Sequence, residues 1–199
     1  MGHCTDDYLF VYSKMITTRL LTPAEFPEYA DWLHQQDSET LKLYFGMAVS
    51  DTFIDQLVNA AVARPDQHNF LIAEDSSVWV GSVHIAEANI NEVEFGIIVD
   101  SARRKQGIGD QLLGEAILWA RNRGYRDLFM SCLTWNTAIR RLCQKHRLDV
   151  KTLGAESETH VKLPPPTLTS VGQEYAIKSM NLYRMVLQNQ GRMFSNILG

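Results

Sequence analysis

The residues from Val93 to Leu113 read VEFGIIVDSARRKQGIGDQLL. An apolar run, a basic turn with two glycines and a second apolar pattern predict a strand, a turn and a helix. In such a turn several backbone N–H groups point toward one place, and the helix adds the positive end of its dipole. Gly107 and Gly109 let the backbone curl tightly and approach a ligand, while residues 103–105 add three positive charges. The stretch therefore predicts a site for a phosphate or pyrophosphate.

The residues around the glycines narrow the type of turn. A dinucleotide fingerprint needs a third glycine where Leu112 stands, and a P-loop needs Gly-Lys-Ser/Thr, whereas Asp110 follows Gly109. The remaining pattern, Arg104-x-x-Gly107-x-Gly109, resembles the coenzyme A signature Arg/Gln-x-x-Gly-x-Gly/Ala of the GNAT superfamily, the acyl-CoA-dependent N-acetyltransferases. The helix after the turn has an apolar face that supports this resemblance: Leu112, Leu113, Ala116, Ile117 and Ala120.

Composition limits the class of protein. The chain has 199 residues, 45% of them hydrophobic, which suits one domain with a full core and a small appendage. No apolar run approaches the length of a membrane span, and the N-terminus lacks the basic start and apolar stretch of a secretory signal. Cys4, Cys132 and Cys143 have no metal or disulfide-framework spacing. These features predict a reduced, cytoplasmic protein.

Charge is distributed unevenly along the chain. Residues 103–151 contain eleven Lys/Arg and four Asp/Glu, a net charge of +7, whereas the whole chain has −4 and the remainder therefore −11. A basic third on an acidic protein fits a polyanionic ligand on one side, although many of these side chains could simply solvate helix faces. The segment lacks the basic-aromatic interleaving of a nucleic-acid stacking platform, so nucleic acid is not expected as a partner.

Periodicity and capping residues predict the order of the elements. The first helix opens at Thr22 with Glu25 three residues later, and the second is capped by Ser50 or Asp51 and ends before Pro65. Further helices are expected over residues 109–123, 137–147 and 173–188. The expected strands are residues 16–21, 70–74, 78–87, 92–99, 127–133, 150–153 and 158–163.

This order is similar to that of GNAT proteins, and the resemblance covers residues 15–163. It implies an α/β fold with a mixed, mostly antiparallel central sheet flanked by helices, followed by an extra C-terminal helix. The expected division is an N-terminal extension (1–14), a GNAT acetyltransferase domain (15–166) and a helical tail (167–199). Residues 41–54 also look loosely like the arm of GNAT proteins related to bacterial protein-lysine acetyltransferases.

Acetyl transfer from a thioester needs a neutral amine, because an alkylammonium with a pKa of about 10.4 is not nucleophilic. Glu92, Glu94 and Gly96 share one face of the expected strand by alternation. The resemblance implies that a Glu about ten residues before the Arg/Gln-x-x-Gly motif deprotonates the amine, directly or through water. Glu94 lies ten residues before Arg104. Glu94 is therefore the candidate general base and Glu92 the alternate, and a plain surface carboxylate remains the other interpretation of either residue.

The resemblance also implies the site for acetyl-CoA. Backbone groups of Ile97, Ile98 and Val99 are expected to bind the pantetheine arm, and the turn is expected to hold the pyrophosphate. The turn residues expected to bind the cofactor are Arg104, Lys105, Gln106, Gly107, Ile108, Gly109 and Asp110.

A second family motif, Asn-x-x-Ala-x-x-Leu-Tyr-x-Lys-x-Gly-Phe, is matched in part from Asn136 to Leu148, at Asn136, Leu142 and Lys145. Cys143 stands where the family usually has a tyrosine that protonates the leaving thiolate. With an ordinary pKa near 8.5, Cys143 could be that proton donor, or it could be a small buried thiol, but it is not expected to be a covalent nucleophile. Asn136 is expected to contact the cofactor or to cap a helix, and the two roles are compatible.

The tail carries an apolar pattern. Ala176, Met180, Tyr183 and Leu187 repeat at helical spacing, which predicts a face that docks on the same chain or on a second copy, giving a monomer or a homodimer.

These observations predict an enzyme: an N-acetyltransferase that moves an acetyl group from acetyl-CoA to a primary amine of a small molecule by direct attack. A protein lysine or N-terminus is the alternative acceptor, and a non-catalytic acyl-CoA sensor is the alternative from another class. The six histidines have no ligand spacing, so no metal is expected, and no membrane is expected as a partner.

Overall fold

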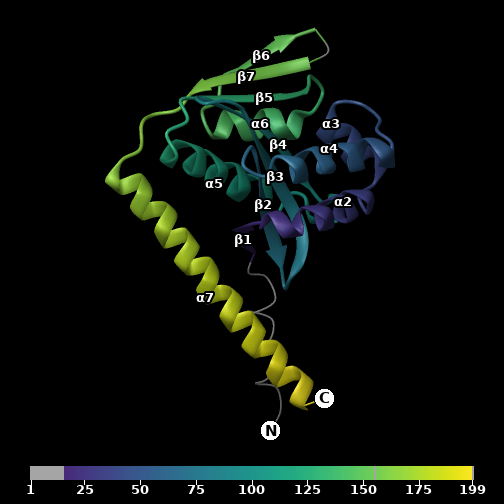
Figure 1. The fold of residues 1–199 in the computed structure, drawn as a ribbon, viewed down its shortest axis with the longest axis vertical. Helices are drawn as coiled ribbons and strands as arrows, with labels where there is room; N and C mark the ends of the chain where they lie inside the picture. Colours follow the sequence, from purple (N-terminus) through teal and green to yellow (C-terminus); the bar gives the residue numbers. More distant parts are fainter. Residues whose placement is uncertain (1–15, 155, 199) are drawn as a thin grey trace.

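A single seven-stranded sheet organises the molecule in the computed structural model, which describes residues 16–154 and 156–198 (Figure 1). The strand order is β1-β2-β3-β4-β5-β7-β6, and every neighbouring pair is antiparallel except β4 and β5. The expected mixed, mostly antiparallel sheet is thereby confirmed, while the expected extension over residues 1–14 lies outside the described residues. The strands are β1 (Thr17–Leu20), β2 (His68–Asp75), β3 (Val78–Asn89), β4 (Glu92–Val99), β5 (Asp127–Leu133), β6 (Val150–Leu153) and β7 (Glu156–Lys162).

Helices cover both faces of this sheet (Figure 1). One core cluster joins the sheet to α5 and α6, and a second joins its other face to α2 and α4, with α3 packed beside them. The helices are α2 (Phe26–His34), α3 (Ser38–Phe45), α4 (Asp51–Ala63), α5 (Ile108–Asn122), α6 (Thr137–Lys145) and α7 (Leu168–Leu198), with short 3₁₀ turns η1 (Pro23–Glu25) and η2 (Ser101–Arg103).

Strand β4 shows why one sheet can carry two cores. Val93, Phe95 and Ile97 are buried on the face covered by α5, whereas Ile98 is buried on the opposite face with α2 and α4. This is the period-two alternation of an extended chain. It places Glu94 and Gly96, which share the face of Ile98, on the side of α3.

The pairing of β4 with β5 ends early. The two strands are in register over residues 92–94 and 127–129, although β4 continues to Val99 and β5 to Leu133. Backbone groups on this side of β4 therefore have no strand partner after Glu94. Because buried backbone N–H and C=O groups need partners, the open part of β4 is a natural place for a ligand with amide groups.

Most of the expected elements are confirmed within one or two residues. The Glu25 carboxylate accepts a hydrogen bond from the Thr22 N–H at 2.8 Å, as the capping pattern predicted, and Ser50 caps α4. Helix α3 was not predicted as a separate helix. It is short and is capped by Asp37, which accepts from the Thr40 N–H at 2.8 Å.

The expected C-terminal helix is present, but it differs from the prediction in its length and in the face that docks on the domain. Helix α7 runs over Leu168–Leu198 rather than 173–188, and its supposed apolar face is not the docked one. Met180 and Tyr183 are 51% and 61% exposed, whereas Ser170 and Asn181 are buried. The face toward the domain combines these polar residues with Ile177 and Met185, so the predicted stripe does not dock on this chain. Its contact with a second copy stays a prediction.

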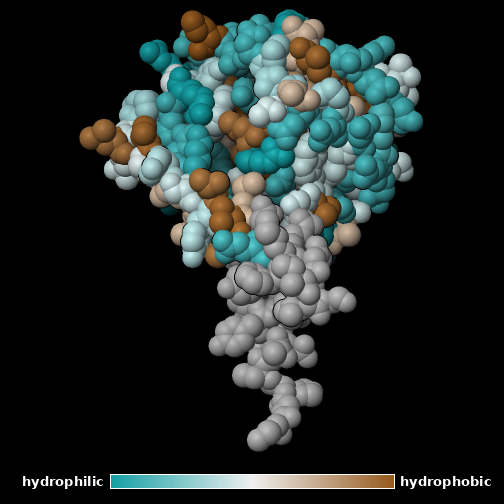
Figure 2. Space-filling view, turned by 60° about the horizontal axis from the view of Figure 1, so that its bottom comes forward, coloured by the Kyte–Doolittle hydropathy of each residue, from teal (hydrophilic) through white to brown (hydrophobic). Residues whose placement is uncertain are grey.

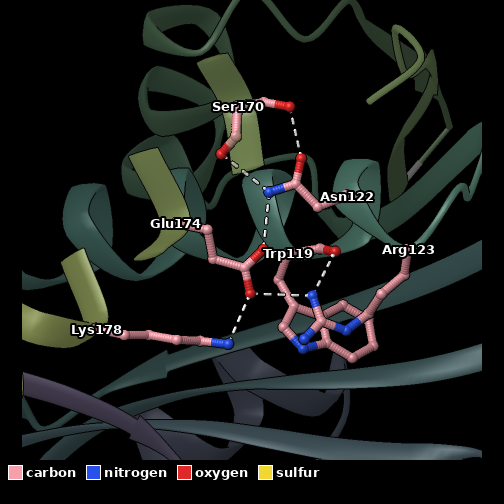
Figure 3. A network of polar contacts seen from close by, with 6 residues as sticks. All are labelled: Trp119, Asn122, Arg123, Ser170, Glu174 and Lys178. Atoms are coloured by element: carbon pink, nitrogen blue, oxygen red, sulfur yellow. Dashed lines mark hydrogen bonds and ion pairs between the residues drawn. The ribbon is translucent and has the colours of Figure 1, made fainter. Parts of the chain in front are cut away.

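Polar contacts fix the first half of α7 to the end of α5 (Figure 3). The Asn122 amide donates to the Ser170 carbonyl at 3.0 Å and to the Glu174 carboxylate at 2.7 Å. Glu174 also pairs with Arg123 at 3.1 Å and Lys178 at 2.8 Å. The Arg123 guanidinium in turn lies 4.1 Å from the centre of the Trp119 ring.

The last turns of α7 extend beyond the sheet (Figure 1). The molecular face shown in Figure 2 is mostly hydrophilic, with several separate apolar patches rather than one continuous apolar surface. Within the described ranges, no helix combines the length and the apolar character that crossing a membrane requires.

Candidate active site

A cavity of about 460 Å³ lies where β4 and β5 part. Its walls come from α3, from the second half of β4, from the turn before α5 and from α6. The residues lining it are Thr40, Leu43, Tyr44, Ile97, Ile98, Val99, Arg103, Arg104, Lys105, Gly107, Ile108, Gly109, Asp110, Asn136, Thr137, Ala138, Ile139, Arg141 and Leu142. All the expected cofactor-binding residues except Gln106 are among them.

The turn before α5 has the backbone geometry of an anion site. Lys105 and Gly107 have φ values of +61° and +82°, so the chain curls through the left-handed region twice within three residues. Gly107 is the N-cap of α5 and therefore offers no side chain to cap the helix. The first N–H groups of α5 have no intrahelical acceptor, and together with the helix dipole they suit a phosphate.

Arg104 connects the turn to α3. Its Nη2 donates to Thr40 Oγ1 at 2.5 Å, and Thr40 Oγ1 donates to Asp37 Oδ2 at 2.7 Å. Thr40 is 1% exposed. The hydrogen bonds from Thr40 lower the pKa of Asp37 to about 2, with a further contribution from the Arg104 charge. Arg104 therefore links the turn before α5 to α3 at the cavity wall, and it also adds a positive charge there.

Several other basic residues are engaged in the fold. Arg103 forms an ion pair with Asp75, and Arg123 and Lys145 pair with Glu174 and Asp110. Of the eleven basic residues in 103–151, four line the cavity: Arg103, Arg104, Lys105 and Arg141. The local excess of positive charge at the cavity is thus much smaller than the sequence total suggested.

Asp110 is a carboxylate in the first turn of α5, beside the expected phosphate position. It contacts Lys145 Nζ at 2.8 Å and His146 Nε2 at 3.0 Å. The hydrogen bond from Lys145 is the main reason that the pKa of Asp110 lies below its usual value. Lys145 therefore offsets a negative charge that would otherwise repel an anion, and His146 contacts the same carboxylate.

Glu94 and Glu92 lie on the same face of β4, but in different surroundings. Glu94 is exposed beside α3, and partial desolvation together with the Glu92 charge raises its pKa. Glu92 lies at the β3–β4 hairpin, where its carboxylate accepts from Asn89 Nδ2 at 2.9 Å. Neither residue lines the cavity itself. Glu94 is two residues closer to it along the strand, and its raised pKa suits a proton acceptor.

Cys143 and Asn136 have different positions on α6. Cys143 is 2% exposed and packs in the core between α5 and the sheet, and burial raises the pKa of its thiol to about 11. It does not line the cavity. Asn136 does line it, and its side-chain oxygen accepts from the Ile139 N–H at 3.3 Å. This placement favours the buried-thiol interpretation of Cys143, and Asn136 is a helix cap at the cavity wall.

The contribution of α3 was largely missed at the sequence level. Thr40, Leu43 and Tyr44 form one wall of the cavity, yet 50 or more residues separate them from the turn. A usable signal was the N-cap pattern Asp37-Ser38-Glu39, which predicts a helix start. No local pattern says which element that helix faces.

Within residues 16–154 and 156–198, no group of three or more His, Cys, Asp or Glu side chains could hold a metal ion.

The chain matches the family described as "Acetyltransferase (GNAT) family" over residues 20–147, which is more than half of its length. A search of curated proteins found no match. Among solved structures, the chain is similar to ribosomal-protein-alanine N-acetyltransferase from Brucella melitensis (20% identity, TM-score 0.58, covering 73% of this chain and 99% of that one).

Two further similar structures contain ligands. One is yncA, a putative acetyltransferase from Salmonella typhimurium with acetyl-CoA (18% identity, TM-score 0.58, 77% and 97% covered). The other is spermidine N-acetyltransferase from Vibrio cholerae with CoA and spermine (14% identity, TM-score 0.59, 74% and 94% covered). The three structures have identities of 14–20% and show a shared fold. The family match over residues 20–147 shows the family: the chain belongs to the GNAT family of acetyltransferases.

Proposed function

We propose that this chain transfers the acetyl group of acetyl-CoA to a primary amine of a small molecule by direct attack. The main support for this proposal is the direction in which the cavity runs. It begins at the turn over residues 104–110, which suits a pyrophosphate, and follows the unpaired part of β4 toward Glu94. A long ligand with a phosphate end and a reactive end fits such a course.

Residues of this chain supply three functions in the proposed reaction. N–H groups around Gly107 hold the pyrophosphate, and backbone groups of residues 97–99 hold the pantetheine arm. Glu94 removes a proton from the ammonium or orders the water that does so. Its pKa is raised by desolvation and by the Glu92 charge, which makes the carboxylate a stronger base for this task.

The similar structures do not distinguish between a small amine and a protein as the acceptor. One similar protein is named for spermidine and another for a ribosomal-protein alanine, so the likeness in fold favours neither. The small amine remains our proposal and a protein lysine or N-terminus the alternative. A non-catalytic acyl-CoA sensor is the alternative from another class.

A thiol-release assay tests the proposal. The protein is incubated with acetyl-CoA and, separately, with a panel of primary amines and a panel of peptides with free N-termini and lysines. We expect free CoA to accumulate with at least one small amine and to depend on Glu94. Release with peptides alone would support the alternative acceptor, and tight acetyl-CoA binding without release in any panel would support the sensor.

A further inference from the structure

A tyrosine of α3 lines the cavity, where the sequence suggested no catalytic group. Tyr44 lines the cavity with Ile97 and Ile98, and its ring covers Gly96, the next residue of β4 toward Glu94. A Cβ built on Gly96 would lie 3.0 Å from Tyr44 Cε2 and 3.2 Å from Tyr44 Oη. Gly96 is therefore the residue that leaves room for this ring.

The position of Tyr44 along β4 matters for any ligand that spans the site. An extended strand rises about 3.3 Å per residue, so Gly96 lies about 10 Å from Val99 at the turn and about 7 Å from Glu94. A ligand held by its phosphates at the turn, with its reactive end near Glu94, must pass the Tyr44 hydroxyl. The Tyr44 hydroxyl and the Glu94 carboxylate are close enough that the Glu94 charge helps to raise the pKa of Tyr44.

Tyr44 is held as a neutral hydrogen-bond donor. Its Oη is 3.4 Å from the Oη of Tyr29, whose side chain is fully buried. Burial is the main reason that the pKa of Tyr44 lies well above its ordinary value, and Tyr29 and Glu94 add to the effect. A phenol less acidic than a thiol does not readily give up its proton to a thiolate, but it can donate a hydrogen bond to one. Either hydroxyl can donate in this pair, and the Tyr44 proton is available to a ligand only when Tyr29 is the donor.

We propose that Tyr44 is a catalytic residue whose hydroxyl donates a hydrogen bond to the sulfur of acetyl-CoA and stabilises the thiolate as it leaves. The inference rests on the proposed function. As the amine nitrogen bonds to the carbonyl carbon, the C–S bond breaks and its electron pair goes to sulfur. The nitrogen proton passes to Glu94 and then to water, and the released thiolate takes a proton from water. Tyr44 keeps its own proton throughout, and the buried Cys143 takes no part.

The first test needs no acceptor, because the probe is CoA itself. Calorimetric titration in buffers of different ionisation enthalpy gives the number of protons released when CoA binds. At pH 8 the wild type should release about 0.2 proton more per CoA than Tyr44→Phe, since a rise of one unit in a thiol pKa near 8.5 lowers the thiolate fraction by that amount. Acetyl-CoA has no ionisable thiol and should show no such difference.

Two matched comparisons separate a catalytic role from a structural one. Tyr44→Phe keeps the ring over Gly96, so the affinity for acetyl-CoA should stay within about twofold while kcat falls about tenfold, which is the usual effect of one hydrogen bond to developing charge. Tyr125→Phe removes the same atom from a tyrosine that donates to Glu87 outside the cavity, and should change neither kcat nor proton release.

The outcomes distinguish the two proposals. Equal proton release by the wild type and Tyr44→Phe, with both binding CoA, would show that Tyr44 does not contact the sulfur and would overturn this inference alone. Failure of the wild type to bind CoA would instead remove the proposed function on which it rests.

Discussion

At the residue scale, Gly107 and Gly124 form a matched pair. Both have positive φ, +82° and +87°, and a Cβ added at either position would meet no other atom within 4 Å. Gly107 lies in the cavity wall, whereas Gly124 follows α5 at its other end. A substitution at either position meets the same backbone strain, but a charge at Gly107 alone lies beside the expected pyrophosphate.

Gly107→Asp should therefore abolish CoA binding, while Gly124→Asp should lower stability without this loss. Asp is one of the residues that tolerate the left-handed region, so both variants are expected to fold. Calorimetric titration with CoA, together with the melting temperature of each variant, measures the two effects. An unchanged affinity of Gly107→Asp for CoA would remove the central claim about the turn.

Glu94→Gln should lower kcat by about 10²–10⁴-fold, as expected when a general base is lost, and should leave CoA affinity nearly intact. Glu92→Gln is the control, because Glu92 is held by Asn89 at the hairpin. A full rate for Glu94→Gln with a loss for Glu92→Gln would mean that the base had been assigned to the wrong carboxylate.

The pH dependence of the wild type gives an independent check on Glu94. A base acts in its ionised form, and the pKa of Glu94 is raised. The rate should therefore decline as pH falls through a value above the ordinary glutamate pKa of about 4.3. In Glu94→Gln this acidic limb of the kcat/KM profile should be absent, and its persistence would assign the limb to another group.

At the scale of elements, the site depends on how α3 meets the turn. Thr40 joins them, because its hydroxyl accepts from Arg104 and donates to Asp37. Thr18 is a comparable buried threonine outside the cavity: its hydroxyl donates to Glu115 and accepts from Asn181, each at 2.6 Å.

Thr40→Val and Thr18→Val should both destabilise the protein, by about 1–3 kcal/mol, because each leaves buried polar partners unsatisfied. Thr40→Val alone should weaken CoA binding, since it releases Arg104 and the cavity wall formed by α3. Denaturant unfolding and calorimetry measure the two quantities. Equal CoA affinities in the two variants would show that the site does not depend on this tie.

At the scale of the whole molecule, α7 is a long helix attached by polar side chains. Asn181 is buried against β1, and Ser170 is buried against α5. Glu174 contacts three residues: Asn122, Arg123 and Lys178. An isolated helix is marginal in water, so these contacts are expected to hold it. They also leave Met180 and Tyr183 exposed, so of the two predicted contacts for these residues only the one with a second copy stays open.

Removal of residues 167–199 should lower the melting temperature while CoA binding stays detectable, because no described residue of α7 lines the cavity. Each kcal/mol lost lowers the midpoint by about 2–4 °C at this size. Removal of residues 188–199 is the control, since the docking contacts described above lie before residue 182, and it should have a much smaller effect. A longer truncation as stable as the full chain, with unchanged mass in solution, would make α7 a free appendage.

The sequence by itself determined the strand-turn-helix unit over residues 93–113, the order of nearly all elements and the family resemblance. These features depend on local causes. Period-two alternation assigned the faces of β4, capping residues indicated where helices begin, and Gly107 suits the positive φ of its own backbone. Such signals lie within a few residues of the position that they predict.

Only the tertiary structure decided which distant side chains share the site. The split between β4 and β5 left part of β4 unpaired, α3 brought Thr40 and Tyr44 to the cavity, and α6 turned Cys143 into the core. The docked face of α7 likewise depends on hydrogen bonds to Asn122 and Thr18, which lie far away in the chain. In each case the deciding energy comes from contacts between residues far apart in the chain, and the pattern of neighbouring residues does not encode which elements will meet.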